Sequence, residues 1–204
     1  MIAIIDYGVG NLFSVRSSFE KIGVETVVTG DKRVIDSADK IILPGVGAFR
    51  DAKRKLDETG LGEFVKEQAR KGKYLMGICL GMQMLFDKSY EYGEYEGLGL
   101  IRGEVTPLEK VLDPALKIPH IGWNGLHFPK EHFLFNYVKE GQHAYFVHSY
   151  HATNCKESVI ATTEYGLEVT AAVAKDNVLG CQFHPEKSGE VGLNILRAFV
   201  EQKD

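Results

Sequence analysis

The stretch Tyr74-Leu-Met-Gly-Ile-Cys-Leu-Gly-Met-Gln-Met-Leu-Phe86 joins a short apolar run directly to a run with helical spacing. Its centre, Gly77-Ile-Cys-Leu-Gly81, has the form glycine-x-nucleophile-x-glycine, which is typical of the sharp strand-to-helix turn called a nucleophile elbow. Flanking glycines let the chain pass closely, so that the central residue can take a strained backbone conformation. The sequence therefore predicts that Cys79 projects from the end of a buried strand.

The same turn would place Cys79 at a helix N-terminus, where the partial positive charge favours a thiolate over a thiol. The alternative interpretation is a small buried hydrophobe at a glycine-containing strand end. A basic partner elsewhere in the chain would decide between the two.

Such a partner is present in Gln182-Phe-His-Pro-Glu-Lys-Ser188. His184 and Glu186 are two residues apart, so they project to the same side if this segment is extended. In a Cys-His-Glu set, the imidazole takes the thiol proton and later protonates the leaving amine, while the carboxylate fixes the imidazole tautomer. The pattern indicates nucleophilic catalysis by Cys79.

The first half of the chain alternates short apolar runs with amphipathic stretches, which is typical of βα units around a parallel sheet. The spacing predicts strands over 2–5, 24–28, 40–43 and 74–78, and helices over about 12–22, 49–57 and 61–70.

The second half consists of shorter runs with strand-like composition, which predict antiparallel hairpins. These strands are expected at 103–107, 126–128, 144–147, 158–164, 170–174 and 178–183, with an exposed loop over 90–99 and a closing helix over 189–200. The expected fold is α/β, with three layers: a mostly parallel central sheet flanked by helices, and an additional antiparallel section. A length of 204 residues fits a single domain spanning 1–204.

Composition excludes several classes of protein. Lys and Arg number 24 against 28 Asp and Glu, a net charge of -4, which disfavours a nucleic-acid partner. The uncharged segment 74–86 is shorter than the roughly 20 residues that span a bilayer. The N-terminus does not resemble a signal peptide, so we expect a cytoplasmic protein without membrane contact.

No cofactor or metal is expected. The histidines His143, His148 and His151 have no carboxylate or thiolate at matching spacing for a metal cluster. Gly8-Val-Gly10 lacks the third glycine of a dinucleotide-binding loop, because position 13 is Phe. Cys155 and Cys181 have no basic neighbour and are expected to be packing residues.

The elbow together with Phe183-His-Pro-Glu186 closely resembles the class I (triad) glutamine amidotransferases, over residues 1 to about 200. Five further strings carry the resemblance: Asp6-Tyr-Gly-Val-Gly-Asn11, Pro44-Gly-Val-Gly47, Pro119-His-Ile-Gly-Trp-Asn124, Phe146-Val-His-Ser-Tyr150 and His184-Pro-Glu-Lys-Ser188. The resemblance implies that Cys79 attacks the side-chain amide of glutamine, ammonia leaves, and water hydrolyses the γ-glutamyl thioester.

The resemblance also implies roles for other positions. The backbone N–H of Leu80, and one from Val46 or Gly47, would hold the oxyanion, while glutamine would be bound by Gly47, Gln83, Ser149 and Tyr150. The glycines flanking Val46 make this loop flexible, so we expect glutaminase activity to depend on a partner that completes the oxyanion hole.

The strings resemble most closely a branch of the family in which a glutaminase subunit passes ammonia to a separate cyclase subunit, a (βα)8 barrel. The resemblance implies that Asn11, Trp123, Asn124 and Lys187 face this partner. The cyclase must be separate, because a barrel alone needs ~250 residues.

Three alternatives stay open at this point. The chain could serve another synthase of the same class, or it could be a noncatalytic docking subunit. It could also be an independent thiol hydrolase, which the fold and the triad alone would permit.

Overall fold

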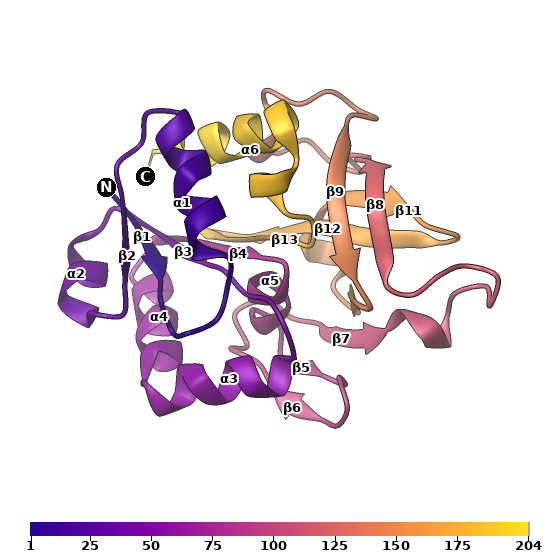
Figure 1. Cartoon of the computed structure of the whole chain (residues 1–204), viewed down its shortest axis with the longest axis horizontal. Helices are drawn as coiled ribbons and strands as arrows, with labels where there is room; N and C mark the ends of the chain where they lie inside the picture. Colours follow the sequence, from indigo (N-terminus) through magenta and orange to yellow (C-terminus); the bar gives the residue numbers. More distant parts are fainter. Residues whose placement is uncertain (204) are drawn as a thin grey trace.

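A sheet of seven strands forms the centre of the computed structural model, which describes residues 1–203 (Figure 1). In spatial order the strands are β11 (Val159–Glu164), β12 (Glu168–Lys175), β13 (Val178–Cys181), β4 (Tyr74–Ile78), β3 (Lys40–Leu43), β1 (Ile2–Ile5) and β2 (Thr26–Thr29). The pairs from β13 to β2 are parallel, whereas β11 and β12 run antiparallel to their neighbours.

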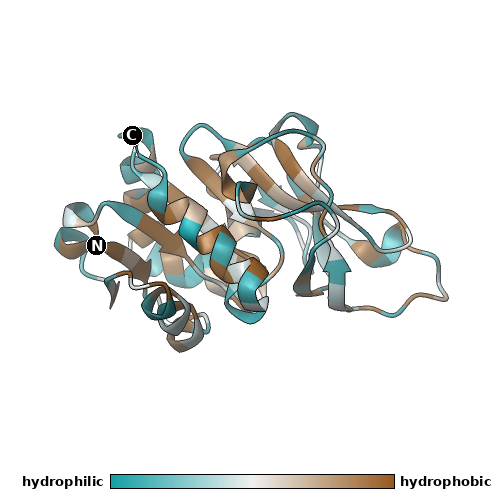
Figure 2. Cartoon of the chain, turned by 90° about the horizontal axis from the view of Figure 1, so that it is seen from above, coloured by the Kyte–Doolittle hydropathy of each residue, from teal (hydrophilic) through white to brown (hydrophobic). Residues whose placement is uncertain are grey.

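Helices cover both faces of this sheet, and its inner strands are therefore buried on both sides. Ile2 and Ile4 pack with α1 (Leu12–Lys21) and α6 (Gly189–Glu201). Ala3 and Ile5 face the other core, which contains residues of α2 (Lys32–Ser37), α3 (Phe49–Glu58), α4 (Leu61–Arg70) and α5 (Leu80–Met84). Figure 2 shows strands that are coloured largely apolar, and helices along which apolar and polar residues alternate. The three-layer α/β architecture expected from the sequence is confirmed.

Two smaller sheets stand beside the central one. A four-stranded sheet has the order β10 (Tyr150–Thr153), β7 (Glu104–Pro107), β5 (Lys88–Ser89) and β6 (Tyr95–Glu96). An antiparallel pair joins β8 (His120–Gly125) to β9 (His143–His148). Short 3-10 helices lie at η1 (Leu108–Lys110), η2 (Phe133–Phe135), η3 (Lys156–Ser158) and η4 (Pro185–Lys187).

Several expectations for the second half were wrong. Residues 126–128 form no strand and contribute only an isolated bridge from His127 to Thr162. The strand expected over 178–183 ends at Cys181, and it pairs in parallel with β4 as well as antiparallel with β12. Strand β8 was missed because its Gly-Trp-Asn-Gly segment has turn-like composition, which pairing with β9 overrides.

Two smaller differences concern polar stretches. Helix α2 was missed; it is short, and its N-terminus is capped by Asp31, whose side chain accepts a hydrogen bond from Arg33 N. The loop over 90–99 is largely exposed as expected, but it contains β6 and the buried Glu91. The Glu91 carboxylate accepts a hydrogen bond from Phe49 N at 2.7 Å, at the start of α3, which ties the loop to the pocket described below.

Candidate active site

Cys79 sits in a strained turn between β4 and α5. Its backbone angles are φ 54° and ψ -111°, a region that residues with a side chain rarely adopt. A Cβ atom at Gly81 would lie 1.9 Å from Leu43 O, and one at Gly77 would lie 2.6 Å from the Gly81 backbone. Both positions therefore require glycine, and the elbow expected from the sequence is present.

His184 comes to Cys79 from the neighbouring strand. Strand β13 pairs with β4, and Cys79 N donates a hydrogen bond to Cys181 O at 2.8 Å. His184 follows three residues later, and its Nδ1 lies 2.7 Å from Glu186 Oε1. The side chains of His184 and Glu186 are only 3% and 2% exposed. Ser188 Oγ donates to His184 O at 2.6 Å, which fixes the backbone of this segment.

The charge of His184 follows from these contacts. Burial lowers the pKa of His184, but its hydrogen bonds to Cys79 and Glu186 outweigh burial and raise the pKa to about 9. The imidazole is therefore protonated at neutral pH. Burial raises the pKa of Cys155 and of Cys181, which keeps both as thiols.

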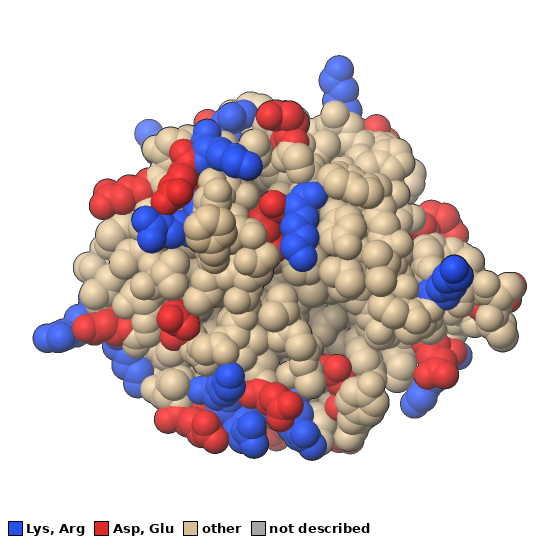
Figure 3. Space-filling view, viewed as in Figure 1, with Lys and Arg blue, Asp and Glu red and all other residues tan. Residues whose placement is uncertain are grey.

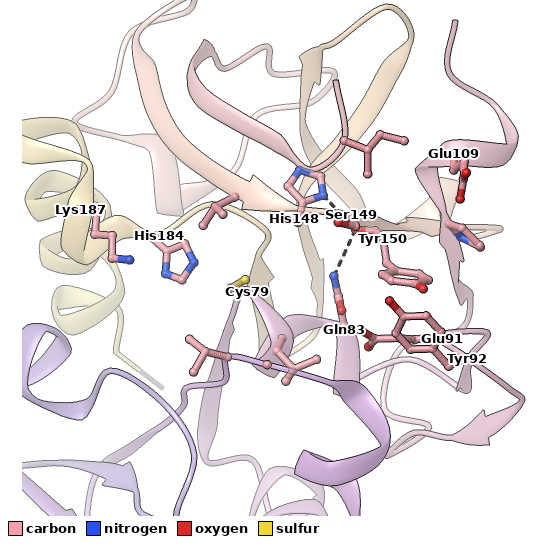
Figure 4. A pocket seen from close by; sticks show the side chains of 16 residues that line it. Cys79, Gln83, Glu91, Tyr92, Glu109, His148, Ser149, Tyr150, His184 and Lys187 are labelled. Carbon is pink, nitrogen blue, oxygen red and sulfur yellow. Dashed lines mark hydrogen bonds between the residues drawn. The ribbon is translucent and has the colours of Figure 1, made fainter. Parts of the chain in front are cut away.

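A cavity of about 450 Å³ opens at Cys79 and His184 (Figure 4). Its wall contains every residue for which the resemblance implied oxyanion or glutamine binding: Val46, Gly47, Leu80, Gln83, Ser149 and Tyr150. Glu91 and Tyr92 also line it and were not expected there, and so does His148, which the sequence left without a role. Charged side chains of both signs lie mainly toward the periphery of the face shown in Figure 3.

The Pro44–Gly47 segment packs directly against the elbow. A Cβ atom at Gly45 would lie 2.7 Å from Gly81 N, so the two backbones touch. Beyond this contact the segment is open: Val46 is 40% exposed, and Gly47 has φ 86°. The structure thus brings Val46 and Gly47 beside Leu80.

Gln83 is held by its neighbours inside the pocket. Its Nε2 donates to Tyr150 O at 3.2 Å and to Gln182 Oε1 at 3.0 Å. The fully buried Gln182 in turn directs its Nε2 at Cys79 Sγ, 3.7 Å away. Sequence reasoning missed Gln182, although its spacing of two from His184 could have placed both on the same side of an extended chain.

Of the residues expected at a partner surface, Asn11, Trp123 and Asn124 lie outside the pocket, whereas Lys187 is part of its wall (Figure 4). Trp123 is 53% exposed and packs edge-to-face on Tyr145, with ring centroids 5.9 Å apart. Lys187 Nζ lies 5.8 Å from the same ring. Asn124 donates from Nδ2 to Glu164 O at 3.0 Å, and Asn11 caps α1 by accepting from Ser14 N at 3.4 Å. Trp123 and Lys187 are thus brought together around Tyr145.

Other expectations concern absences. Within residues 1–203, no group of three or more His, Cys, Asp or Glu side chains is arranged to hold a metal ion. His143 is exposed, whereas His148 and His151 are buried. No helix among the described residues is both long and apolar enough to cross a membrane.

Comparison with known proteins gives three consistent matches. Residues 3–203 match the family Glutamine amidotransferase class-I. A protein of Sulfurimonas denitrificans named "Imidazole glycerol phosphate synthase subunit HisH" is 51% identical, covering 100% of this chain and 99% of that protein. A protein of the same name from Geobacillus thermodenitrificans is 50% identical, covering 98% and 95%.

Solved structures agree in fold. One described as a glutamine amidotransferase has a TM-score of 0.76 at 19% identity, covering 98% of both chains. The structure of PurLQS from Thermotoga maritima gives 0.75 at 20% identity, covering 98% of this chain and 96% of that one.

Proposed function

Because this chain belongs to the class I glutamine amidotransferases, we propose that Cys79, His184 and Glu186 are the triad with which it hydrolyses glutamine. The observation that carries the assignment of these residues is the elbow geometry. A strained Cys79 faces the pocket beside a buried His184, which is bonded to Glu186 at 2.7 Å.

The chemistry begins with the Cys79 thiolate and the protonated His184. The sulfur attacks the amide carbon of glutamine, a C–S bond forms, and the carbonyl electrons move to oxygen. His184 gives its proton to the nitrogen as the C–N bond breaks, and ammonia leaves. Water, deprotonated by the now neutral His184, attacks the thioester; glutamate is released and Cys79 is restored. Glu186 orients His184 throughout.

Backbone N–H groups stabilise the oxyanion in this proposal. Leu80 N follows the nucleophile, and Val46 or Gly47 supplies the second donor from the segment packed on Gly81. Gly47, Gln83, Ser149 and Tyr150 bind glutamine, a role supported by their position around the cavity next to Cys79.

The chain is the glutaminase subunit of imidazole glycerol phosphate synthase, acting in histidine biosynthesis. Support comes from relatives of that name that are about half identical over their whole length. Its partner is a separate cyclase subunit, a (βα)8 barrel in the cytoplasm, which uses the ammonia to make imidazole glycerol phosphate and AICAR. Trp123, Asn124, Lys187 and Asn11 form the partner surface, supported by the exposure of Trp123.

Glutamate release tests this proposal. The chain is assayed alone, and then with the cyclase subunit and its nucleotide substrate. We expect the pair to exceed the isolated chain by on the order of 10²-fold or more, since completing an oxyanion hole has effects of that size. Equal rates with and without the cyclase would favour an independent thiol hydrolase, and stimulation only by a different synthase would reassign the partner.

Two cysteine variants separate catalysis from docking. Cys79→Ala should abolish activity, by on the order of 10⁴-fold or more, while still binding the cyclase. Cys155→Ala removes another buried thiol, which lies beside Thr170 at 3.9 Å, and should keep the wild-type rate. No activity in the wild-type complex would favour a noncatalytic docking subunit.

A further inference from the structure

Two buried histidines connect the pocket wall to strand β8. His120 Nδ1 lies 3.0 Å from His148 Nε2, and the two residues are 0% and 6% exposed. Each outer ring nitrogen faces an oxygen: His148 Nδ1 lies 2.9 Å from Tyr150 O, and His120 Nε2 lies 2.8 Å from Asn124 Oδ1. The pair therefore makes three close polar contacts in a row.

The surroundings keep both rings neutral. The His120 ring lies between Phe146 and Tyr165, with ring centroids 5.0 and 4.0 Å away. Burial lowers the pKa of both histidines, that of His148 to about 3 despite its hydrogen bond to the backbone, and nearby His151 and His184 oppose a further positive charge. At neutral pH the pair holds two ring protons.

Two protons cannot serve three contacts. Tyr150 O can only accept, and so can Asn124 Oδ1, because the amide nitrogen of Asn124 is already used to donate to Glu164 O at 3.0 Å. The contact between the two rings needs a proton of its own. One of the three contacts therefore lacks a hydrogen in the neutral pair. Protons on His120 Nε2 and His148 Nδ1 would serve both oxygens but leave two nitrogen lone pairs facing each other at 3.0 Å, which is repulsive, so two arrangements remain.

In the first arrangement both protons are on Nε2 atoms. His120 then donates to Asn124, His148 donates to His120, and Tyr150 O receives nothing from the pair. Tyr150 O still has a donor, because Gln83 Nε2 lies 3.2 Å away. In the second arrangement both protons are on Nδ1 atoms, Tyr150 O is bonded, and Asn124 Oδ1 has no donor. The first arrangement leaves a donor for every acceptor, whereas the second leaves the partly buried Asn124 Oδ1 without one, so the first is favoured while Asn124 keeps its orientation.

We infer that the His120–His148 pair is a two-state positioning element for the glutaminase pocket. Its Nδ1-protonated form holds the carbonyl of Tyr150, and its Nε2-protonated form releases it. That carbonyl also accepts from Gln83, which bonds Gln182, which reaches Cys79 Sγ. The state of the pair therefore reaches the nucleophile through one hydrogen-bonded chain.

Strand β8 connects the His120–His148 pair to the surface of the protein. Ile121 and Trp123 alternate with His120 and Asn124 along the strand and are 56% and 53% exposed. A partner seated on them that turns the Asn124 amide, so that Nδ2 faces His120, favours the Nδ1-protonated form. The inference that a bound partner sets the protonation state of the pair rests on the proposed function. The existence of the two states does not.

Nuclear magnetic resonance of the isolated chain with ¹⁵N-labelled histidine tests the two states directly. We expect His148 to be the Nε2–H tautomer in the wild type and to move to the Nδ1–H tautomer in Asn124→Ala, which removes the acceptor. A wild-type pair carrying three ring protons, or a His148 tautomer that Asn124→Ala leaves unchanged, would overturn the inference. The measurement needs neither partner nor turnover, so it stands apart from a failure of the proposed function.

A double-mutant cycle tests the link to the pocket. A glutamine analogue carrying a chloroketone alkylates Cys79, and the concentration dependence of labelling separates apparent affinity from maximal rate. Asn124→Ala should tighten the apparent affinity about threefold, the size of one hydrogen bond. His148→Phe should abolish this gain, and so should His120→Phe, whose ring fits the same aromatic stack.

The control is His127→Phe, a change at an exposed histidine bonded to Glu140 at 2.9 Å. It should leave the gain from Asn124→Ala intact. Independent, additive effects of Asn124→Ala and the two pair variants would show that no coupling passes through the histidines.

Discussion

The elbow and the Pro44–Gly47 segment lie against each other, yet they are built in opposite ways. At Gly77 and Gly81 there is no room for a further carbon, with backbone atoms 2.6 and 1.9 Å from the position it would take. At Gly47 a further carbon would meet nothing within 4 Å, and Val46 beside it is 40% exposed. Steric contact thus fixes Cys79. In the Pro44–Gly47 segment, Pro44 O accepts a hydrogen bond from Tyr7 OH at 2.7 Å and Gly45 packs on the elbow, whereas the end proposed to supply the second oxyanion donor has open space around it.

This contrast is what the proposed dependence on a partner requires. Cys79 keeps its strained conformation only if its surroundings hold it there, and the tightly packed backbone at Gly77 and Gly81 does so. The Gly47 end has no such surroundings, so contacts from outside the chain can set its conformation. A partner needs to supply little energy to rearrange a segment that packs against so little.

The largest expected effect is that of Gly81→Ala. The added carbon would collide with Leu43 O, so β3 and the elbow must separate. We expect the free energy of unfolding to fall by about 4 kcal/mol or more, with loss of Cys79 labelling. Urea unfolding measures the first and the chloroketone the second. A stable, fully labelled Gly81→Ala protein would show that the elbow is not fixed sterically.

The second-largest effect concerns the positive charge of His184, which lies beside the elbow. Glu186→Gln keeps the shape of the side chain but removes the carboxylate that helps to raise the pKa of His184 to about 9. We expect kcat in the complex to fall by on the order of 10²- to 10⁴-fold. Because the pKa of His184 drops, the imidazolium is lost at lower pH, and the alkaline limb of the rate profile moves to lower pH.

The pH profile of the complex checks this sign. Glu190→Gln is the control, since Glu190 is an exposed carboxylate in the first turn of α6 and its removal should not shift the limb. A limb that stays in place in Glu186→Gln would mean that Glu186 does not set the charge of His184.

The smallest effect is expected at the open segment. Gly47→Ala meets no steric obstacle but must adopt φ 86°, which costs about 1–2 kcal/mol in stability. Gly72→Ala is the matched control, because Gly72 also has positive φ and open space but lies after α4. Both variants should lose similar stability, and only Gly47→Ala should weaken stimulation by the cyclase. If Gly47→Ala lowered the free energy of unfolding as much as Gly81→Ala does, the Gly47 end would be packed as tightly as the elbow.

The parts of the fold that are local in sequence were predictable. Strands β1, β3 and β4 are short apolar runs, and their bounds agree with expectation because burial on both faces leaves no room for polar residues. The elbow follows from five consecutive residues, and His184 with Glu186 from three. These signals need no knowledge of the rest of the chain.

The parts that depend on distant pairing were not. Strand β8 contains two glycines and an asparagine, and it is a strand only because β9 lies beside it. The position of Gln182 in the site depends on its contacts with Cys79 and Gln83, which the parallel pairing of β13 with β4 brings near it. His148 was left without a role, since nothing in its local sequence indicates that His120 faces it.

The place of β13 has a consequence for synthesis of the protein. This strand is inserted between β12 and β4 although it follows nearly all of the chain. During translation the hydrogen-bonding edge of β4 therefore stays open until the last quarter of the polypeptide leaves the ribosome, and an open inner edge invites pairing with other chains. Cys79 and His184 cannot meet before that moment, so a prematurely terminated chain lacks the pair proposed to release ammonia.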